Sequence, residues 1–108
     1  MLSEQEFLAT FAELRRDTLY VWIERGWLSP VRDGGAWQFR EIDVARVRLI
    51  RELNEDLDLT ADALDVVLPL LDQVHGLRRE LRRLADAVDT QPPEIRNRIL
   101  RSLGDRHP

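Results

Sequence analysis

Carboxylates are the residues of this sequence with the clearest chemical potential, and seven of them gather between positions 52 and 72. A concentrated acidic surface attracts a basic protein partner, because complementary charge raises the association rate and selects among partners. The alternative is that these carboxylates only solvate their helices, since acidic side chains are usually exposed. The seven residues are Glu52, Glu55, Asp56, Asp58, Asp62, Asp65 and Asp72.

A second pattern lies just after the carboxylates, where apolar residues recur at alternating spacings of three and four. This period keeps one apolar seam on a helix facing a partner helix, so the segment favours self-association. The seam contains only Val and Leu, with no Asn or Lys to fix one register, so parallel and antiparallel pairing both remain open. Its members are Val67, Leu70, Val74, Leu77, Leu81, Leu84 and Val88.

Catalytic and metal chemistry find little support in the composition. The chain has no Cys and only two His, His75 and His107, so a thiolate nucleophile is excluded and a metal centre is not expected. No nucleophile stands with a base, and no Gly-rich phosphate loop is present. We predict a protein without enzymatic activity, metal or cofactor.

Net charge bears on the kind of partner. The 108 residues carry 20 acidic and 16 basic side chains, giving a charge of -4, which argues against an undirected affinity for phosphate backbones. If the protein did bind DNA, the candidate contacts would be Arg15, Arg16 and Arg40. No basic leader and no apolar run of membrane-spanning length is present, so we expect a cytoplasmic protein.

The N-terminal elements read as a winged helix-turn-helix. Ser3 with Glu6 has the form of a capping box before a helix over residues 4–12, and a second helix over 15–25 stops at Gly26. The Asp33-Gly34-Gly35 turn predicts a two-stranded wing, whose Trp37 and Phe39 fold back onto the helices. A third helix is predicted over residues 41–57.

The remaining elements form a long helix and a short one. Thr60 is a candidate cap for a helix that runs to Asp89, with a bend predicted near Pro69. A short amphipathic helix over residues 94–103 and a frayed tail follow. The expected division is a winged head (1–60), a long helix for docking and dimerisation (61–90) and a C-terminal segment (91–108).

The order of these elements resembles the head of MerR-type regulators between Thr18 and Leu68, with Gly26, Leu28 and Pro30 at matching positions. Tyr20-Val21-Trp22-Ile23 stands where that pattern has Arg-Tyr-Tyr-Glu, and Gln38 stands where its wing has Arg. The DNA-contacting residues of the pattern are therefore missing.

A closer resemblance, from Glu6 to about Leu84, is to the CbpM-type chaperone modulators. It rests on Trp37 and Phe39 in the wing, on the spacing of the Leu residues from Arg48 to Leu59, and on the segment VVLPLLDQVHGLRRELRRL.

The resemblance implies a mainly α fold: a MerR-like winged helix-turn-helix with a small two-stranded wing and a long C-terminal dimerisation helix. It implies a homodimer that binds the J-domain of a CbpA/DnaJ-type co-chaperone and inhibits its cooperation with the DnaK-type chaperone. J-domains are commonly basic along the surface concerned, so the resemblance implies that the seven acidic residues named above form the docking surface. The alternative is a MerR-type DNA-binding transcriptional regulator.

Overall fold

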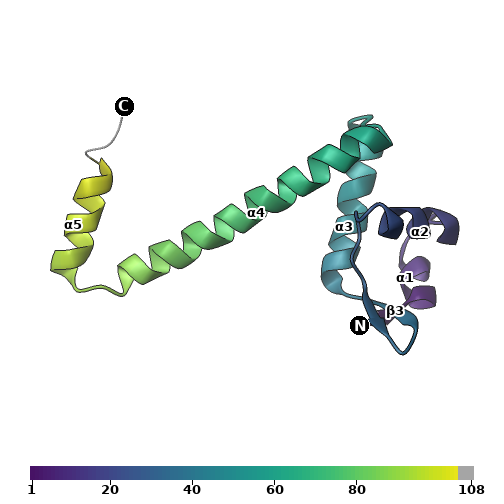
Figure 1. Ribbon diagram of the computed structural model, residues 1–108, viewed down its shortest axis with the longest axis horizontal. Coiled ribbons are helices and arrows are strands. Elements are labelled where there is room, and N and C mark those ends of the chain that lie inside the picture. Colours follow the sequence, from purple (N-terminus) through teal and green to yellow (C-terminus); the bar gives the residue numbers. More distant parts are fainter. Residues whose placement is uncertain (105–108) are drawn as a thin grey trace. The chain divides into compact units, whose positions relative to one another are not determined.

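The computed structural model describes residues 1–104, which are mainly helical, with a small antiparallel sheet (Figure 1). This confirms the fold class expected from the sequence. The described chain forms two compact units, Met1–Pro69 and the part from Leu70 onward. The helices are α1 (Glu4–Thr10), α2 (Arg16–Glu24), α3 (Glu41–Arg51), the π-helical turn η1 (Glu52–Asp56), α4 (Ala61–Asp89) and α5 (Pro93–Gly104). The strands are β1 (Leu2–Ser3), β2 (Val31–Asp33) and β3 (Ala36–Phe39).

The helix-turn-helix begins with the predicted capping box. The Ser3 hydroxyl accepts a hydrogen bond from the Glu6 backbone N–H at 3.2 Å, and the Glu6 carboxylate accepts one from the Ser3 N–H at 3.0 Å. Helix α1 ends at Thr10, two residues earlier than expected, and Glu13 takes a positive φ of 63° in the turn before α2. Gly26, at φ 79°, follows α2 and confirms the predicted left-handed stop.

The wing differs from expectation in its number of strands. Gly34 and Gly35 both have positive φ, as a two-residue type I′ hairpin turn requires, and Arg32 lies opposite Trp37 across the two strands. Strand β1 adds to the other edge of β3, with Leu2 opposite Phe39. The predicted hairpin of β2 and β3 is confirmed, whereas β1 was not predicted, because a two-residue strand is too short to show any alternation.

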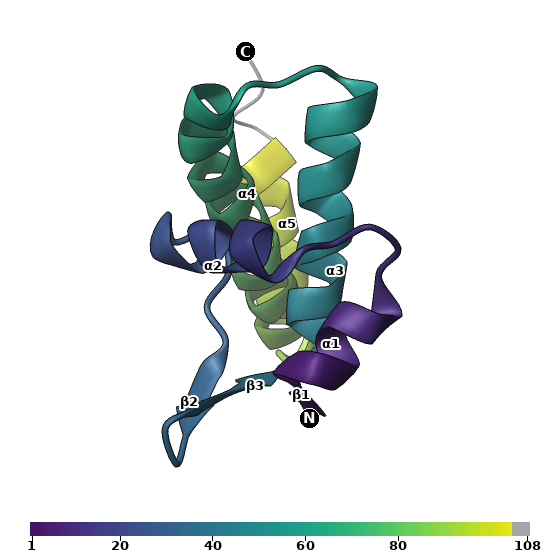
Figure 2. The ribbon, with the colours of Figure 1, turned by 90° about the vertical axis from the view of Figure 1, so that its right-hand side faces the viewer.

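A stacked pair of phenylalanines joins the sheet to the helices within the first unit, where β3 lies beside α1 (Figure 2). The rings of Phe7 and Phe39 are 4.1 Å apart and nearly parallel, and both side chains are fully buried. The inward packing predicted for Phe39 is confirmed, whereas Trp37 is only half-buried. The other buried apolar residues are Leu19, Trp27, Leu28, Val47, Ile50, Leu53, Leu64 and Leu68.

The third helix changes character in its last turn. Beyond Arg51 the chain continues as η1, in which the Leu57 N–H donates to the Glu52 carbonyl five residues back, at 3.3 Å. Asp58, at φ 54°, then turns the chain, so the predicted α-helix to Leu57 is corrected to an α-helix followed by a π-helical turn. The Thr60 hydroxyl accepts a bond from the Ala63 N–H at 3.2 Å, as expected of a cap.

The first turns of α4 belong to the head. Leu64 and Leu68 are buried, and between them the Asp65 carboxylate accepts a 2.7 Å hydrogen bond from the indole N–H of Trp27 and a 3.0 Å bond from Arg25. The helix continues through Pro69 to Asp89, and the bend there stays a prediction. Gly104 closes α5, while residues 105–108 of the expected tail lie outside the described part.

The capping box makes the stability of the head depend on pH. Hydrogen bonds from the Ser3 backbone and hydroxyl hold the pKa of Glu6 below its ordinary value of 4.5. Their stabilising effect is complete above that value and is lost as pH falls through the lowered folded pKa. Replacing Glu6→Gln should therefore reduce the loss of unfolding free energy on acidification, measured by urea denaturation. Glu24→Gln, at an exposed carboxylate of α2, is the control; equal acid sensitivity of wild type and Glu6→Gln would contradict the assignment.

The Asp65 contact should be a main support of α4 on the head. Replacing Asp65→Ala leaves the buried Trp27 N–H without its acceptor, so the unfolding free energy should fall by about 1–3 kcal/mol. Asp56→Ala, at an exposed carboxylate of η1, should change it by less than about 0.5 kcal/mol. Denaturant unfolding followed by tryptophan fluorescence measures both. Equal losses in the two variants would show that the contact adds nothing.

Candidate functional site

Five of the seven predicted docking carboxylates lie on a continuous stretch of the first unit. Glu52, Glu55 and Asp56 lie on η1, Asp58 in the following loop and Asp62 in the first turn of α4, and all five are exposed. Within residues 1–104 none of these five takes part in an ion pair. We call this stretch the acidic corner, defined by these five residues.

Two hydrogen bonds hold the loop between η1 and α4, which contains Asp58 of the acidic corner. The Leu59 N–H donates to the Leu53 carbonyl at 3.0 Å, and the Asn54 side-chain amide donates to the Leu59 carbonyl at 3.0 Å. Both bonds tie the loop to the turn before it. The carboxylates are thus presented from an ordered backbone, which lowers the entropy lost when a partner binds.

Asp65 and Asp72 differ from the acidic corner in their surroundings. Asp65, whose side chain is 42 % exposed, accepts hydrogen bonds from Trp27 and Arg25, so its carboxylate contributes to the attachment of α4. Asp72 lies on α4 beyond the boundary between the two units. Neither shares the continuous stretch of the other five.

The three arginines considered for DNA are not equivalent. Arg16 pairs with Glu4 at 3.4 Å, and Arg40 contacts Asp43 at 3.5 Å while donating to the Ser29 carbonyl at 2.9 Å. Arg15 precedes α2 and is exposed. The first 69 residues contain eight Arg against fourteen Asp and Glu. A head with this balance repels a phosphate backbone at long range.

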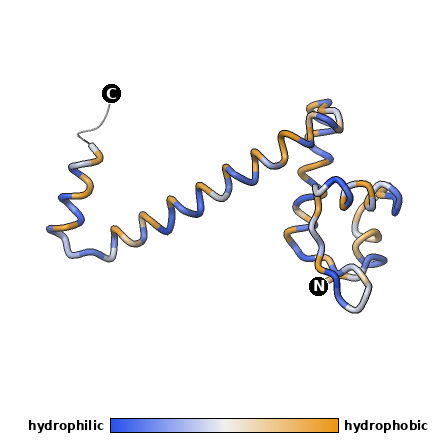
Figure 3. Tube along the Cα trace, viewed as in Figure 1, coloured by the Kyte–Doolittle hydropathy of each residue, from blue (hydrophilic) through white to orange (hydrophobic). Residues whose placement is uncertain are grey.

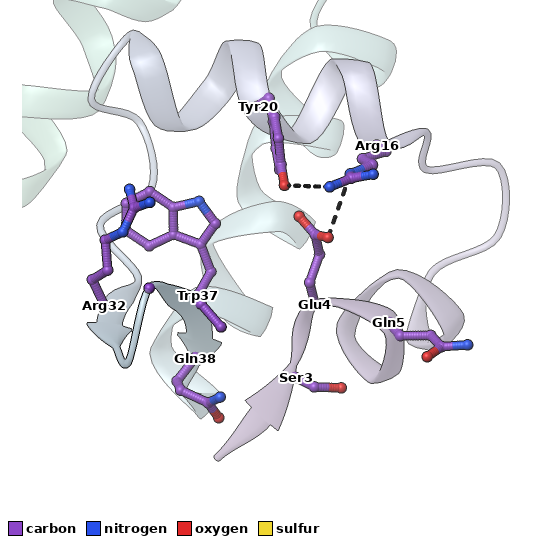
Figure 4. Close-up of a pocket in the computed structure, with 10 residues that line it drawn as sticks. Ser3, Glu4, Gln5, Arg16, Tyr20, Arg32, Trp37 and Gln38 are labelled. Carbon is purple, nitrogen blue, oxygen red and sulfur yellow. Dashed lines mark hydrogen bonds and ion pairs between the residues drawn. The ribbon is translucent and has the colours of Figure 1, made fainter.

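A pocket of about 630 Å³ opens between α2 and the wing (Figure 4). Tyr20 and Arg16 come from α2, Glu4 from α1, and Trp37 from β3. The Arg16 guanidinium donates to the Tyr20 hydroxyl at 3.0 Å, and the same hydrogen bond is the main reason that the pKa of Arg16 is raised. The guanidinium of Arg32, on β2, lies 4.7 Å from the centre of the Trp37 ring.

The sequence analysis did not predict that Glu4, Arg32 and Trp37 line the same pocket. The pairing of Arg32 with Trp37 had a signal, because a two-residue Gly34-Gly35 turn places these positions opposite each other. The approach of Glu4 to Arg16 had none, since the two residues belong to different helices.

The predicted seam on α4 is mostly open to solvent. Leu70, Val74, Leu77, Leu81 and Leu84 are exposed by 41–64 %, and apolar and polar residues alternate along this part of the helix (Figure 3). Val67 and Val88 are half-buried. An apolar stripe of this length on a single helix calls for a covering surface.

Within residues 1–104, no group of three or more His, Asp or Glu side chains could hold a metal ion. Among the described helices, none combines the length and the apolar character needed to cross a bilayer.

Comparison with known proteins gives one match, to the family described as MerR HTH family regulatory protein, over residues 4–86. No curated protein and no solved structure matches the chain. The matched range includes the helix-turn-helix, the wing, α3, η1 and most of α4. The chain therefore belongs to the MerR HTH family of regulatory proteins.

Proposed function

We propose that this regulator is a chaperone modulator that binds the J-domain of a CbpA/DnaJ-type co-chaperone and inhibits its cooperation with the DnaK-type chaperone. The observation that carries the proposal is the acidic corner. Its five exposed carboxylates lie on η1, in the loop after it and in the first turn of α4, and none of them takes part in an ion pair within the described residues. A basic domain surface complements such a cluster of charge.

The composition of the head supports a protein partner over DNA. Phosphate contacts by cations supply most nonspecific affinity for DNA, and here Arg16 and Arg40 each contact a carboxylate of the same head. Gln38 occupies the wing position at which the MerR pattern has Arg. We further propose that the protein acts in the cytoplasm as a non-enzymatic regulator and needs no cofactor.

A second candidate function is DNA-binding transcriptional regulation of the MerR type. The specific observation in its favour is that Arg16 and Arg32 line one groove between α2 and the wing, with the exposed Arg15 just before α2. The excess of carboxylates in the head is the observation against it.

Charge reversal at the acidic corner tests the first proposal. The double replacement Asp56→Arg and Asp62→Arg should weaken J-domain binding by about 100-fold or more at low salt, because attraction becomes repulsion. Neither residue is buried, so folding should be retained. Isothermal titration calorimetry with the J-domain measures the change, and Glu24→Arg, which reverses a charge on α2, is the control. Unchanged affinity in the double variant at low salt would rule the acidic corner out.

Self-association belongs to the same proposal. The seam residues Leu70, Val74, Leu77, Leu81 and Leu84 are exposed although all are Leu or Val, and a second copy of the same seam is the complement that such a repeat favours. A homodimer would carry two winged heads and two acidic corners. Two copies raise the effective affinity for any partner that presents more than one J-domain.

Placing a charge in the seam tests the dimer. Leu77→Asp with Leu81→Asp should convert a dimer into a monomer at micromolar concentration, because each carboxylate would have to be buried in the apolar interface. His75→Asp adds a charge on the same helix next to the seam and should leave the dimer intact. Sedimentation velocity reports the masses. A wild-type protein that sediments as a monomer would refute the dimer directly.

A further inference from the structure

The pocket between α2 and the wing, here called the wing pocket, contains the ion pair of Glu4 and Arg16. This pair leaves one carboxylate oxygen without a hydrogen-bond partner among the described residues. One carboxylate oxygen, Oε2, lies 3.4 Å from Arg16 Nε. The other, Oε1, is buried without a hydrogen-bond partner among the described residues. An unpaired buried oxygen costs free energy, and an ion pair whose arginine is 65 % exposed returns little because solvent screens it. Glu4 also lies in the first turn of α1, where the helix dipole favours a carboxylate, but this does not account for the approach of its side chain to Arg16.

Arg16 is held in the pocket by three interactions. It contacts Glu4, it donates to the Tyr20 hydroxyl, and its guanidinium lies 5.1 Å from the centre of the Tyr20 ring. Figure 4 shows Glu4 reaching toward Arg16, with Tyr20 above and Trp37 to one side. The Glu4 carboxylate thus occupies the place beside Arg16 that an anionic ligand would take.

The same pocket holds a second cation. Arg32 lies over Trp37 on the wing, so the groove presents two guanidinium groups, one from α2 and one from the hairpin. Two cations with fixed aromatic supports suit a phosphodiester backbone, to which Arg binds through its planar fork. Glu4 neutralises one of the two.

We propose that Glu4 is a specificity-determining residue that masks a latent phosphate-binding groove formed by Arg16, Tyr20, Arg32 and Trp37. With its carboxylate in place the groove rejects nucleic acid, and without it the groove binds a nucleic-acid backbone. A protein can gain specificity by carrying a charge that repels the wrong partner. Here the negative carboxylate of Glu4 would repel the negative phosphates of nucleic acid. The mask is independent of the J-domain proposal, because it concerns a different surface and a different class of ligand.

The test is a titration of a labelled generic DNA duplex at low salt, followed by fluorescence anisotropy. Glu4→Gln and Glu4→Ala should each bind roughly tenfold more tightly than wild type, because one cation becomes available to phosphate. The slope of log affinity against log salt should steepen by about one. Glu24→Gln removes an equal charge outside the pocket and should produce a much smaller gain.

A second replacement tests whether the gain depends on Arg16, and Arg16→Gln alone separates the mask from net charge, because a general charge effect would lower the affinity of that variant. Adding Arg16→Gln to Glu4→Gln should abolish the gain, whereas Arg16→Gln alone should leave the weak wild-type affinity unchanged. Equal gains in Glu4→Gln and Glu24→Gln, no gain in either Glu4 variant, or a gain that persists without Arg16 would each overturn the proposal. Thermal unfolding of every variant verifies that the head is folded.

Discussion

The attachment of α4 to the winged head is the constraint on which the rest of the structure depends. Leu64 and Leu68 bury one stripe of the helix, and Asp65 between them accepts the indole N–H of Trp27. A buried N–H with a carboxylate acceptor is costly to break, because the donor is otherwise left unsatisfied. This contact holds the first turns of α4 on the head, and it therefore helps to position Asp62 of the acidic corner.

Charge divides the head into two different surfaces. None of the five carboxylates of the acidic corner takes part in an ion pair with another described residue, whereas in the wing pocket Glu4 pairs with Arg16. The chain has the helix-turn-helix of a MerR HTH family protein, and two of its cations, Arg16 and Arg40, contact carboxylates of the same head. One fold can serve different ligands, because the ligand is set by the side chains of the site and not by the architecture.

Local patterns predicted most of the fold. Ser3 with Glu6, the Gly34-Gly35 turn and the apolar periodicity of α4 are short-range signals, and each gave its element correctly. The short strand β1 and the π-helical turn lacked such signals, because both depend on tertiary packing. The contacts within the candidate sites could not be predicted from local patterns. Asp65 with Trp27, and Glu4 with Arg16, are pairs of residues distant in sequence, and no periodicity indicates such a contact.

The proposed function requires the head to bind a basic protein domain in preference to nucleic acid. A competition measures this preference: the wild-type protein is titrated with a fluorescent J-domain in the presence and absence of excess generic duplex, at low and at physiological salt. We expect J-domain binding that weakens with salt and is unaffected by the duplex. Binding of the duplex with no detectable affinity for the J-domain would contradict it.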